Sequence, residues 1–253
     1  MTGPSGGPGS GRSHYSYAHY ADRDVAEGFD ALRFSGPIGR YLLESQERLL
    51  TEALAPLDGR RVLDVGTGTG RAAIGLGVAG AHVVGLDASA EMLRVAGERL
   101  MRAGLAPLLA IADAHDLPLA DRSADAVVCL RLLMHVVDWQ KCVSEFCRVA
   151  RWRVVVDFPA LGSAAALESG ARRLAHALGR KTEAYRVIAE RDVEAAFRAH
   201  GYRVVMVRRQ FVLPIAFHKA VGSLPFTRTV ERALEAAGLL RLFGSPVTMV
   251  AER

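Results

Sequence analysis

The feature of this chain that most restricts its possible folds is the segment 61–71, which reads RVLDVGTGTGR. An apolar run that contains Asp64 is followed by three alternating glycines and then by residues that favour a helix. Glycine lets the backbone turn sharply and approach a ligand more closely than a Cβ would allow, and the first turn of the next helix offers free N–H groups. This order of strand, glycine loop and helix predicts a loop that binds a nucleoside cofactor.

Two further acidic residues follow apolar runs. Asp87 ends the run 83–86, and Asp113 follows the run 108–112. Asp87 comes 23 positions after Asp64, which is where a doubly wound α/β fold places the carboxylate that binds ribose hydroxyls. Because the carboxyl ends of parallel strands meet at one crevice, the three carboxylates predict a single ligand site.

Strands and helices alternate along most of the chain. Strands are expected at 61–65, 82–87, 108–112, 125–130, 153–158, 202–207 and 246–251. Helices are expected at 69–79, 89–103 and 138–150, with two helices within 161–199 and a helical insertion at 214–243 that is broken near Gly222 and Pro225. Such alternation predicts an α/β fold with a doubly wound, mostly parallel sheet that is covered on both faces. At 253 residues the chain suits one domain, 14–253, after a flexible tail, 1–13, that lacks the apolar core of a secretory signal.

Four motif blocks, at 64–70, 87–93, 113–118 and 123–129, resemble in order and spacing the S-adenosylmethionine-dependent methyltransferases of the Rossmann-like class. Residues 40–160 look most like the small-molecule branch that includes the ubiquinone and menaquinone biosynthesis methyltransferases. The resemblance implies a seven-stranded sheet whose last two strands form an edge hairpin with one antiparallel strand.

The resemblance also implies elements that cover the substrate. These are an N-terminal helical lid at 14–57 and helical insertions at 159–200 and 213–244. One departure is that the family usually has a Pro-Gly-Gly turn before the fifth strand, where this chain reads RVARWR at 148–153. We therefore expect a differently built turn at that point.

S-adenosylmethionine is the cofactor that the resemblance implies. Asp64 would order the glycine loop, Asp87 would hold the ribose diol, and Asp113 would accept a hydrogen bond from the adenine amino group. Arg131 would face the methionine part of the cofactor, or else bind a carboxylate of the substrate or merely cap a surface. The cofactor-binding residues expected are Asp64, Gly66, Thr67, Gly68, Asp87, Ala88, Met92, Asp113, Ala114, Leu130 and Arg131.

A nicotinamide or flavin dinucleotide fold is the alternative, because it also needs a glycine loop and an acidic residue after the second strand. Its fingerprint places a third glycine three positions after the second, where this chain has Arg71. The block at 113–118 has no role in dinucleotide binding. A methyl donor is therefore favoured.

Two residues are candidates for catalysis. His135 matches a histidine common in the family at the start of the helix 138–150, where imidazole can act as a base near neutral pH or can simply orient the loop. Tyr20 belongs to an aromatic and polar cluster at 14–20, which either closes over the site or packs as part of an N-terminal segment.

The positive charge of the chain lies in its C-terminal part. Residues 141–253 carry 19 Lys and Arg against 10 Asp and Glu, whereas residues 1–140 carry 13 against 17. This excess makes an RNA methyltransferase an alternative function, but the arginines are not interleaved with aromatic residues as in a single-strand binding groove. We expect O-, C- or N-methylation of a small, apolar or aromatic molecule rather than of nucleic acid. A cofactor-binding protein without turnover is the third alternative.

Cysteine content and hydropathy exclude other classes. Cys129, Cys142 and Cys147 make neither a disulfide framework nor a metal set, so we expect reduced thiols in a cytoplasmic protein and no metal site. No apolar run approaches the ~20 residues of a membrane span. The oligomeric state stays open.

Overall fold

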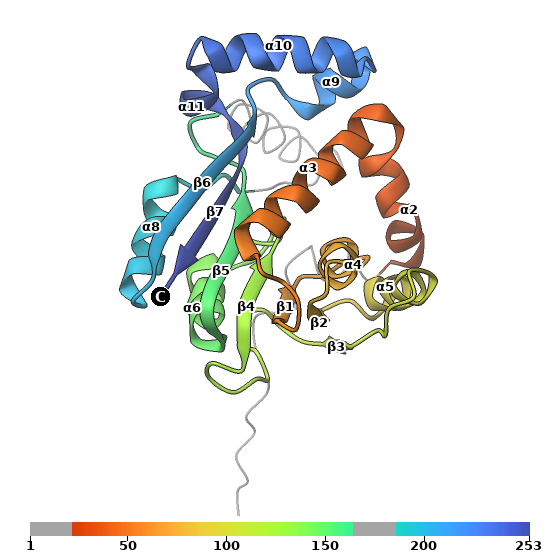
Figure 1. Ribbon diagram of the computed structural model, residues 1–253, viewed down its shortest axis with the longest axis vertical. Helices are drawn as coiled ribbons and strands as arrows, with labels where there is room; N and C mark the ends of the chain where they lie inside the picture. Colours follow the sequence, from red (N-terminus) through yellow and green to blue (C-terminus); the bar gives the residue numbers. More distant parts are fainter. Residues whose placement is uncertain (1–21, 164–185) are drawn as a thin grey trace, which may run out of the picture.

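A computed structural model describes residues 22–163 and 186–253 of the chain. One sheet forms its centre, and helices cover both faces (Figure 1). The strands are β1 (Arg61–Val65), β2 (His82–Asp87), β3 (Leu109–Ile111), β4 (Ala124–Cys129), β5 (Ala150–Phe158), β6 (Arg203–Phe211) and β7 (Ser245–Glu252). The described helices are α2 (Arg23–Phe34), α3 (Gly36–Leu54), α4 (Arg71–Val78), α5 (Ala90–Arg102), α6 (Trp139–Val149), α8 (Glu190–Ala199), α9 (Ile215–Val221), α10 (Leu224–Ala236) and α11 (Leu239–Phe243).

The seven strands lie in the order β3-β2-β1-β4-β5-β7-β6. Strands β1 to β5 pair in parallel, and β7 runs antiparallel to both β5 and β6. The predicted doubly wound sheet and its edge hairpin are thereby confirmed. The order reverses at β1, which lies between β2 and β4, and such a switch point leaves a crevice outside the carboxyl ends of the strands.

Alternate residues of the central strands enter two separate cores. In β5, Val154 and Val156 pack in the core that contains residues of α6 and α8, whereas Val155 packs in the core that contains residues of α3 and α4. All three valines are fully buried. Burial on both faces explains why these strands are nearly continuous apolar runs in the sequence.

The fifth strand begins earlier than the sequence predicted. α6 ends at Val149 and β5 starts at Ala150 with no intervening turn. Ala150 pairs with Ala124 across an irregular stretch of the β4–β5 ladder, and its carbonyl accepts a 2.8 Å hydrogen bond from the hydroxyl of Tyr202. These two contacts of Ala150 occur at the position where the family usually has its Pro-Gly-Gly turn.

The C-terminal insertion is divided where it was expected to be. α9 ends at Val221 and is capped by Gly222, which has a left-handed φ of 68°; α10 begins at Leu224 with Pro225 in its first turn. The expected tail at 1–13, the cluster at 14–20 and residues 164–185 of the other insertion lie outside the described residues. Among the helices that the structure describes, none is long and apolar enough to cross a membrane.

Candidate functional site

A cavity opens at the carboxyl ends of β1, β2 and β4, at the point where the strand order reverses. Many of the expected cofactor residues line it. Those after β1 and β2 are Gly66, Thr67, Gly68, Asp87, Ala88 and Met92. Those after β3 and β4 are Ala114, Leu130 and Arg131. Segments far apart in the sequence thus meet at one place, whereas Asp64 and Asp113 are not among the lining residues.

The glycine loop needs its glycines for two reasons. Gly66 and Gly68 have left-handed φ angles of 72° and 54°, which residues with a Cβ rarely adopt. A Cβ on Gly66 would also lie 3.0 Å from Cδ2 of Leu132, on the far wall of the cavity. The loop therefore brings bare backbone against the space where a ligand would sit.

Asp87 joins the glycine loop to the next helix. One carboxylate oxygen accepts the N–H of Gly68 and the other accepts the N–H of Ser89, both at 2.9 Å. Ser89 in turn caps α5 by accepting the N–H of Met92 at 3.1 Å. Burial raises the pKa of Asp87, and the N–H donors oppose that shift. Asp87 lines the cavity, where a carboxylate can accept a hydrogen bond from a hydroxyl of a ligand.

Asp64 lies beneath the loop and is buried. Its carboxylate accepts a 2.7 Å hydrogen bond from the hydroxyl of Thr67, which fixes the first turn of the loop. Burial raises the pKa of Asp64 to about 6, with Asp87 adding to the shift and the bond from Thr67 opposing it. Asp64 thus supports the loop from below, as its expected ordering role requires.

Asp113 makes contacts on the rim of the site. It accepts the backbone N–H of His115 at 2.9 Å and lies 2.6 Å from Nδ1 of the same residue. Nε2 of His115 then accepts the N–H of Asp138, the residue that caps α6. These bonds tie the loop after β3 to the start of α6, while Ala112 and Ala114 face the cavity. A direct contact between Asp113 and adenine stays a prediction.

The sequence reasoning missed Arg71 as a lining residue and treated it only as a departure from the dinucleotide fingerprint. The guanidinium carbon of Arg71 lies 3.7 Å from the ring centroid of Phe34, and that of Arg131 lies 5.5 Å from the same ring. Both arginines line the cavity. The position of Arg71, as the first residue of α4 after the glycine loop, is the signal that could have identified it.

The buried carboxylate of Asp157 feels the positive charges of Arg71 and Arg131. Asp157 of β5 accepts the backbone N–H of Arg131, and Gln46 of α3 donates to it at 3.3 Å. Burial raises the pKa of Asp157, while the positive charges of Arg131 and Arg71 lower it. The positive and negative charges at the strand ends therefore compensate one another.

Of the two candidates for catalysis, His135 lies among the described residues and Tyr20 does not. His135 is buried and lines the cavity, and its backbone N–H donates to the carbonyl of Leu132 at 2.8 Å. An imidazole is therefore placed beside the expected cofactor site. Tyr20 lies outside the described residues.

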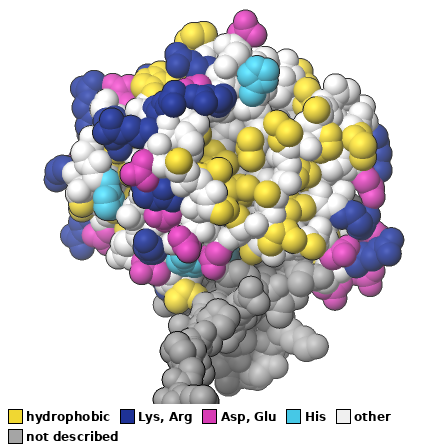
Figure 2. Space-filling view, turned by 90° about the horizontal axis from the view of Figure 1, so that it is seen from below, with side chains coloured by type: hydrophobic (Ala, Val, Ile, Leu, Met, Phe, Trp, Pro, Cys, Tyr) yellow, Lys and Arg dark blue, Asp and Glu magenta, His cyan; other side chains and the backbone are white. Residues whose placement is uncertain are grey.

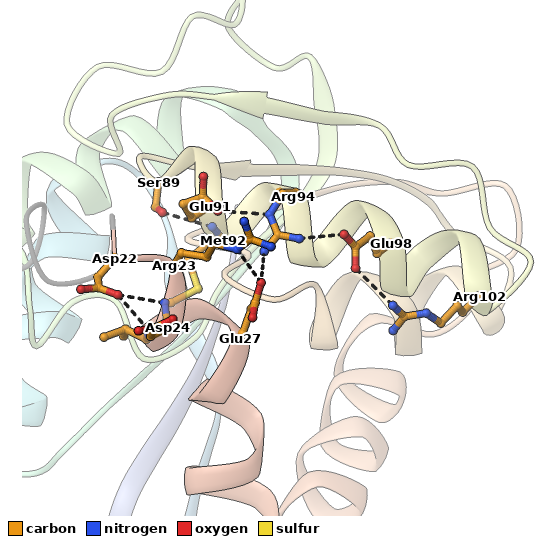
Figure 3. A network of polar contacts seen from close by, with 11 residues as sticks. Asp22, Arg23, Asp24, Glu27, Ser89, Glu91, Met92, Arg94, Glu98 and Arg102 are labelled. Atoms are coloured by element: carbon orange, nitrogen blue, oxygen red, sulfur yellow. Dashed lines mark hydrogen bonds and ion pairs between the residues drawn. The ribbon is translucent and has the colours of Figure 1, made fainter.

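Helix α2 is attached to α5 by charged side chains (Figure 3). Arg94 of α5 contacts Glu27 of α2 at 2.7 Å and also contacts Glu91 and Glu98 of its own helix at 3.1 and 2.7 Å. Because α2 ends at Phe34, this attachment links the N-terminal helices to the arginines of the cavity.

The cysteines take no part in the site. All three are buried and free, and burial raises the pKa of Cys147 to about 12. Within 22–163 and 186–253, no group of three or more His, Cys, Asp or Glu residues is arranged to hold a metal ion.

Comparison with known proteins identifies the class of domain. Residues 63–153 match the family model described as a methyltransferase domain. The demethylmenaquinone methyltransferase of Clavibacter sepedonicus is 42% identical over 101 residues, which make up 40% of this chain and 41% of that protein. The chain thus spans about two-fifths of that relative's length.

Solved structures share the whole fold at low identity. The magnesium protoporphyrin IX methyltransferase of Synechocystis PCC 6803, solved with bound SAH, has a TM-score of 0.63 and 19% identity, over 91% of this chain and 97% of that one. The [4+2]-cyclase SpnF has a TM-score of 0.59 and 18% identity, over 83% of this chain and 80% of that one. The match of residues 63–153 to the methyltransferase domain model confirms the resemblance seen in the motifs.

The raised pKa of Asp64 predicts a pH dependence of stability. Its folded-state pKa of about 6 exceeds the usual aspartate value of 3.8, so the folded protein binds this proton more tightly than the unfolded chain does. The stabilising contribution is present below pH 4 and is lost as the pH rises through 6; two pKa units amount to about 3 kcal/mol. Urea unfolding at pH 4 to 7 should show the free energy of unfolding of the wild type falling over this range relative to Asp64→Asn.

Asp116→Asn, at an exposed carboxyl on a nearby loop, is the control for general effects of removing a charge. A difference between wild type and Asp64→Asn that stays constant from pH 4 to 7 would contradict the assignment.

Proposed function

We propose that this protein transfers a methyl group from S-adenosylmethionine to a small molecule. The observation that carries the proposal is the 2.9 Å hydrogen bond from Gly68 to Asp87, which joins a glycine loop and a strand-end carboxylate at one cavity. The cavity lies within or beside the segment that matches the methyltransferase domain. The relative in Clavibacter sepedonicus is named for methylation of a small molecule, which supports the same class of acceptor.

The lining residues fit the chemistry of this cofactor. Gly66 and Gly68 line the cavity, so their bare backbone would pack against the methionine part. Asp87 would accept hydrogen bonds from the two ribose hydroxyls, and such bonds to a charged acceptor are strong. Met92 and Ala114 would offer apolar surface to the adenine ring. When bound, the cofactor supplies a methyl carbon on a positively charged sulfur, which is already an activated leaving group.

The protein's own task would be alignment. Holding an acceptor atom in line with the methyl group supplies a large share of the barrier reduction, because two reactants are then fixed at one site. His135 is the candidate base, since its buried ring lines the cavity and a ring nitrogen could take the proton of an acceptor hydroxyl. Leu132 and Val136 would help to exclude water.

The elements expected to cover the acceptor pack against one another. Phe34, Ile38 and Leu42 from the N-terminal helices form a buried cluster with Phe211 of β6, and Ile215 of α9 packs on it. This cluster supports the assignment of 14–57 as a lid and of 213–244 as a substrate cover. The N-terminal helices and the C-terminal insertion would then enclose the acceptor together.

Three of the arginines lie at the end of the sheet away from the cavity, which supports a small acceptor over RNA. Arg61 lies 3.7 Å from Asp125, and Arg153 and Arg203 both contact Glu252, at the amino ends of β1, β5 and β6. Figure 2 views the molecule from this end, with Lys and Arg side chains mainly on its left side. The cavity opens at the other end of the sheet, so an RNA held here would not bring a nucleotide to it.

Cofactor binding without methyl transfer is the second candidate function. The likeness to a protein named as a [4+2]-cyclase favours it, because the same fold then serves a different reaction. Methyl transfer from labelled donor to a panel of small acceptors separates the two candidates.

Asp87→Ala should weaken the binding of S-adenosylhomocysteine about 10- to 100-fold, because hydrogen bonds to a charged group contribute roughly 1.5–3 kcal/mol. Calorimetric titration measures the dissociation constant, and circular dichroism shows whether the variant is folded. Asp116→Ala, an exposed aspartate outside the cavity, should bind like the wild type. An unchanged dissociation constant for a folded Asp87→Ala would refute the ribose assignment.

If α2 belongs to a lid, amide hydrogen exchange in residues 22–34 should slow when S-adenosylhomocysteine binds, because closure protects the helix. Glu27→Gln should speed exchange there in the free protein, since it removes the contact with Arg94. Arg102→Gln is the matched control, because Arg102 contacts Glu98 within α5 and not α2. Identical exchange with and without ligand would mean that α2 is a permanently packed segment.

A further inference from the structure

We propose that the outer edge of β3, with the apolar surface beside it, is the contact between two copies of this chain related by a two-fold axis. This surface, the β3 patch, consists of Val78, Met101, Leu108 and Ile111. These side chains are 69%, 60%, 54% and 64% exposed and are four of the five most exposed large hydrophobic side chains of the described residues. In Figure 2, hydrophobic side chains gather on the centre and right of the view, the side on which β3 lies in Figure 1.

The β3 patch is one surface although its residues come from three elements. Leu105 packs on α4, because its Cδ1 lies 2.9 Å from where a Cβ on Gly77 would be, next to Val78. The N–H of Leu105 donates to the carbonyl of Leu100 in α5 at 3.0 Å, next to Met101. The segment that leads into β3 therefore joins the ends of α4 and α5.

The surroundings of the β3 patch carry little charge. Residues 72–81 read AAIGLGVAGA and residues 103–112 read AGLAPLLAIA, without Lys, Arg, Asp or Glu. Arg102, which lies just before the second stretch, is paired with Glu98 at 3.1 Å. Because a charged group loses its hydration when it is buried against apolar surface, the best match for this patch is another uncharged apolar surface.

β3 also offers backbone groups for strand pairing. It is the outermost strand on its side of the sheet and pairs with β2. The carbonyl of Leu108 and the N–H of Ala112 bond to β2 at 2.8 and 3.0 Å. Since the backbone groups of alternate strand residues point to opposite edges, those of Leu109 and Ile111 point away from the sheet. An exposed edge of this kind is a template for another strand.

The distribution of charge favours a second copy as the occupant. The chain has a net charge of +5, so two copies repel unless their basic surfaces are far apart. β6, at the other edge of the sheet, carries Arg203, Arg208 and Arg209. The seven strands between these edges span roughly 30 Å, which exceeds the screening length of about 8 Å at physiological ionic strength.

Pairing β3 with β3 keeps those arginines apart, whereas pairing β3 with β6 would bring them against the apolar patch. An interface that uses the same surface on both copies closes as a dimer and does not extend into a filament. In the antiparallel pair, Leu109 of each copy would exchange hydrogen bonds with Ile111 of the other, and Ala110 would lie at the axis. Ala112, which lines the cavity, follows Ile111 directly, so the contact would also hold the strand that ends at the cavity wall.

Sedimentation velocity of the full chain at micromolar concentration and physiological ionic strength tests the proposal. We expect a species of twice the 27.2 kDa of the chain. Ile111→Lys and Ile111→Glu should each weaken the dimer at least tenfold, because two like charges then lie as diagonal neighbours across the axis. An equal mixture of the two variants should dimerise like the wild type, because the charges are then opposite.

Val205→Lys is the matched control, since Val205 is an exposed valine of the other edge strand, β6. It should dimerise like the wild type, and circular dichroism shows whether each variant is folded. A wild type that stays monomeric at its highest soluble concentration would overturn the proposal. So would a dimer that both Ile111 variants leave unchanged, or a mixture of the two that is no more dimeric than either alone.

The chain's own N-terminal segment is the alternative occupant of this edge. In that case the wild type would be monomeric, and amide hydrogen exchange at 108–112 would be slow in the full chain and fast after removal of residues 1–21. That result would also overturn the proposal.

Discussion

The hydrogen bond from the backbone of Gly68 to the carboxylate of Asp87 is the interaction on which the site depends. It joins the loop after β1 to the end of β2, and through Ser89 it also sets the start of α5. The N–H groups of Gly66 and Thr67 also tie the loop to β2, because both donate to the carbonyl of Leu86 at 2.8 and 2.9 Å; the bond from Gly68 adds the contact with the carboxylate expected to bind ribose. A single carboxylate therefore organises the protein backbone and presents acceptor oxygens to a ligand.

Charge compensation governs the rest of the cavity. Parallel strands bring Asp64, Asp87 and Asp157 to the same end of the sheet, where burial raises the pKa of each. Arg71 and Arg131 offset part of this cost, and their stacking on Phe34 ties the charged centre to the N-terminal helices. Phe34, the last residue of α2, therefore links the N-terminal helices expected to cover the site to the two arginines of the cavity.

The sequence was sufficient for the fold because its signals are local. Glycine spacing, strand-end acids and apolar runs predicted the parallel sheet, whereas the edge hairpin and most of the lining residues were predicted from the family resemblance. The contacts of Phe34 with Arg71 and Arg131 could not be predicted, because they join segments separated by dozens of residues through side-chain packing. The same holds for the start of β5 at Ala150, which depends on pairing with Ala124 and on the hydroxyl of Tyr202. Asp113 lies where the motif predicted it, but its carboxylate contacts the backbone N–H and Nδ1 of His115. Motif spacing does not predict this local contact.

The central claim is that the cavity beside Gly68 and Asp87 binds a methyl donor and not a dinucleotide. Calorimetric titration of the full chain with S-adenosylhomocysteine and, separately, with NAD tests it most directly. We expect saturable heat at a one-to-one ratio with S-adenosylhomocysteine and no saturable heat with NAD. Saturable binding of NAD, with no heat from S-adenosylhomocysteine, would contradict it.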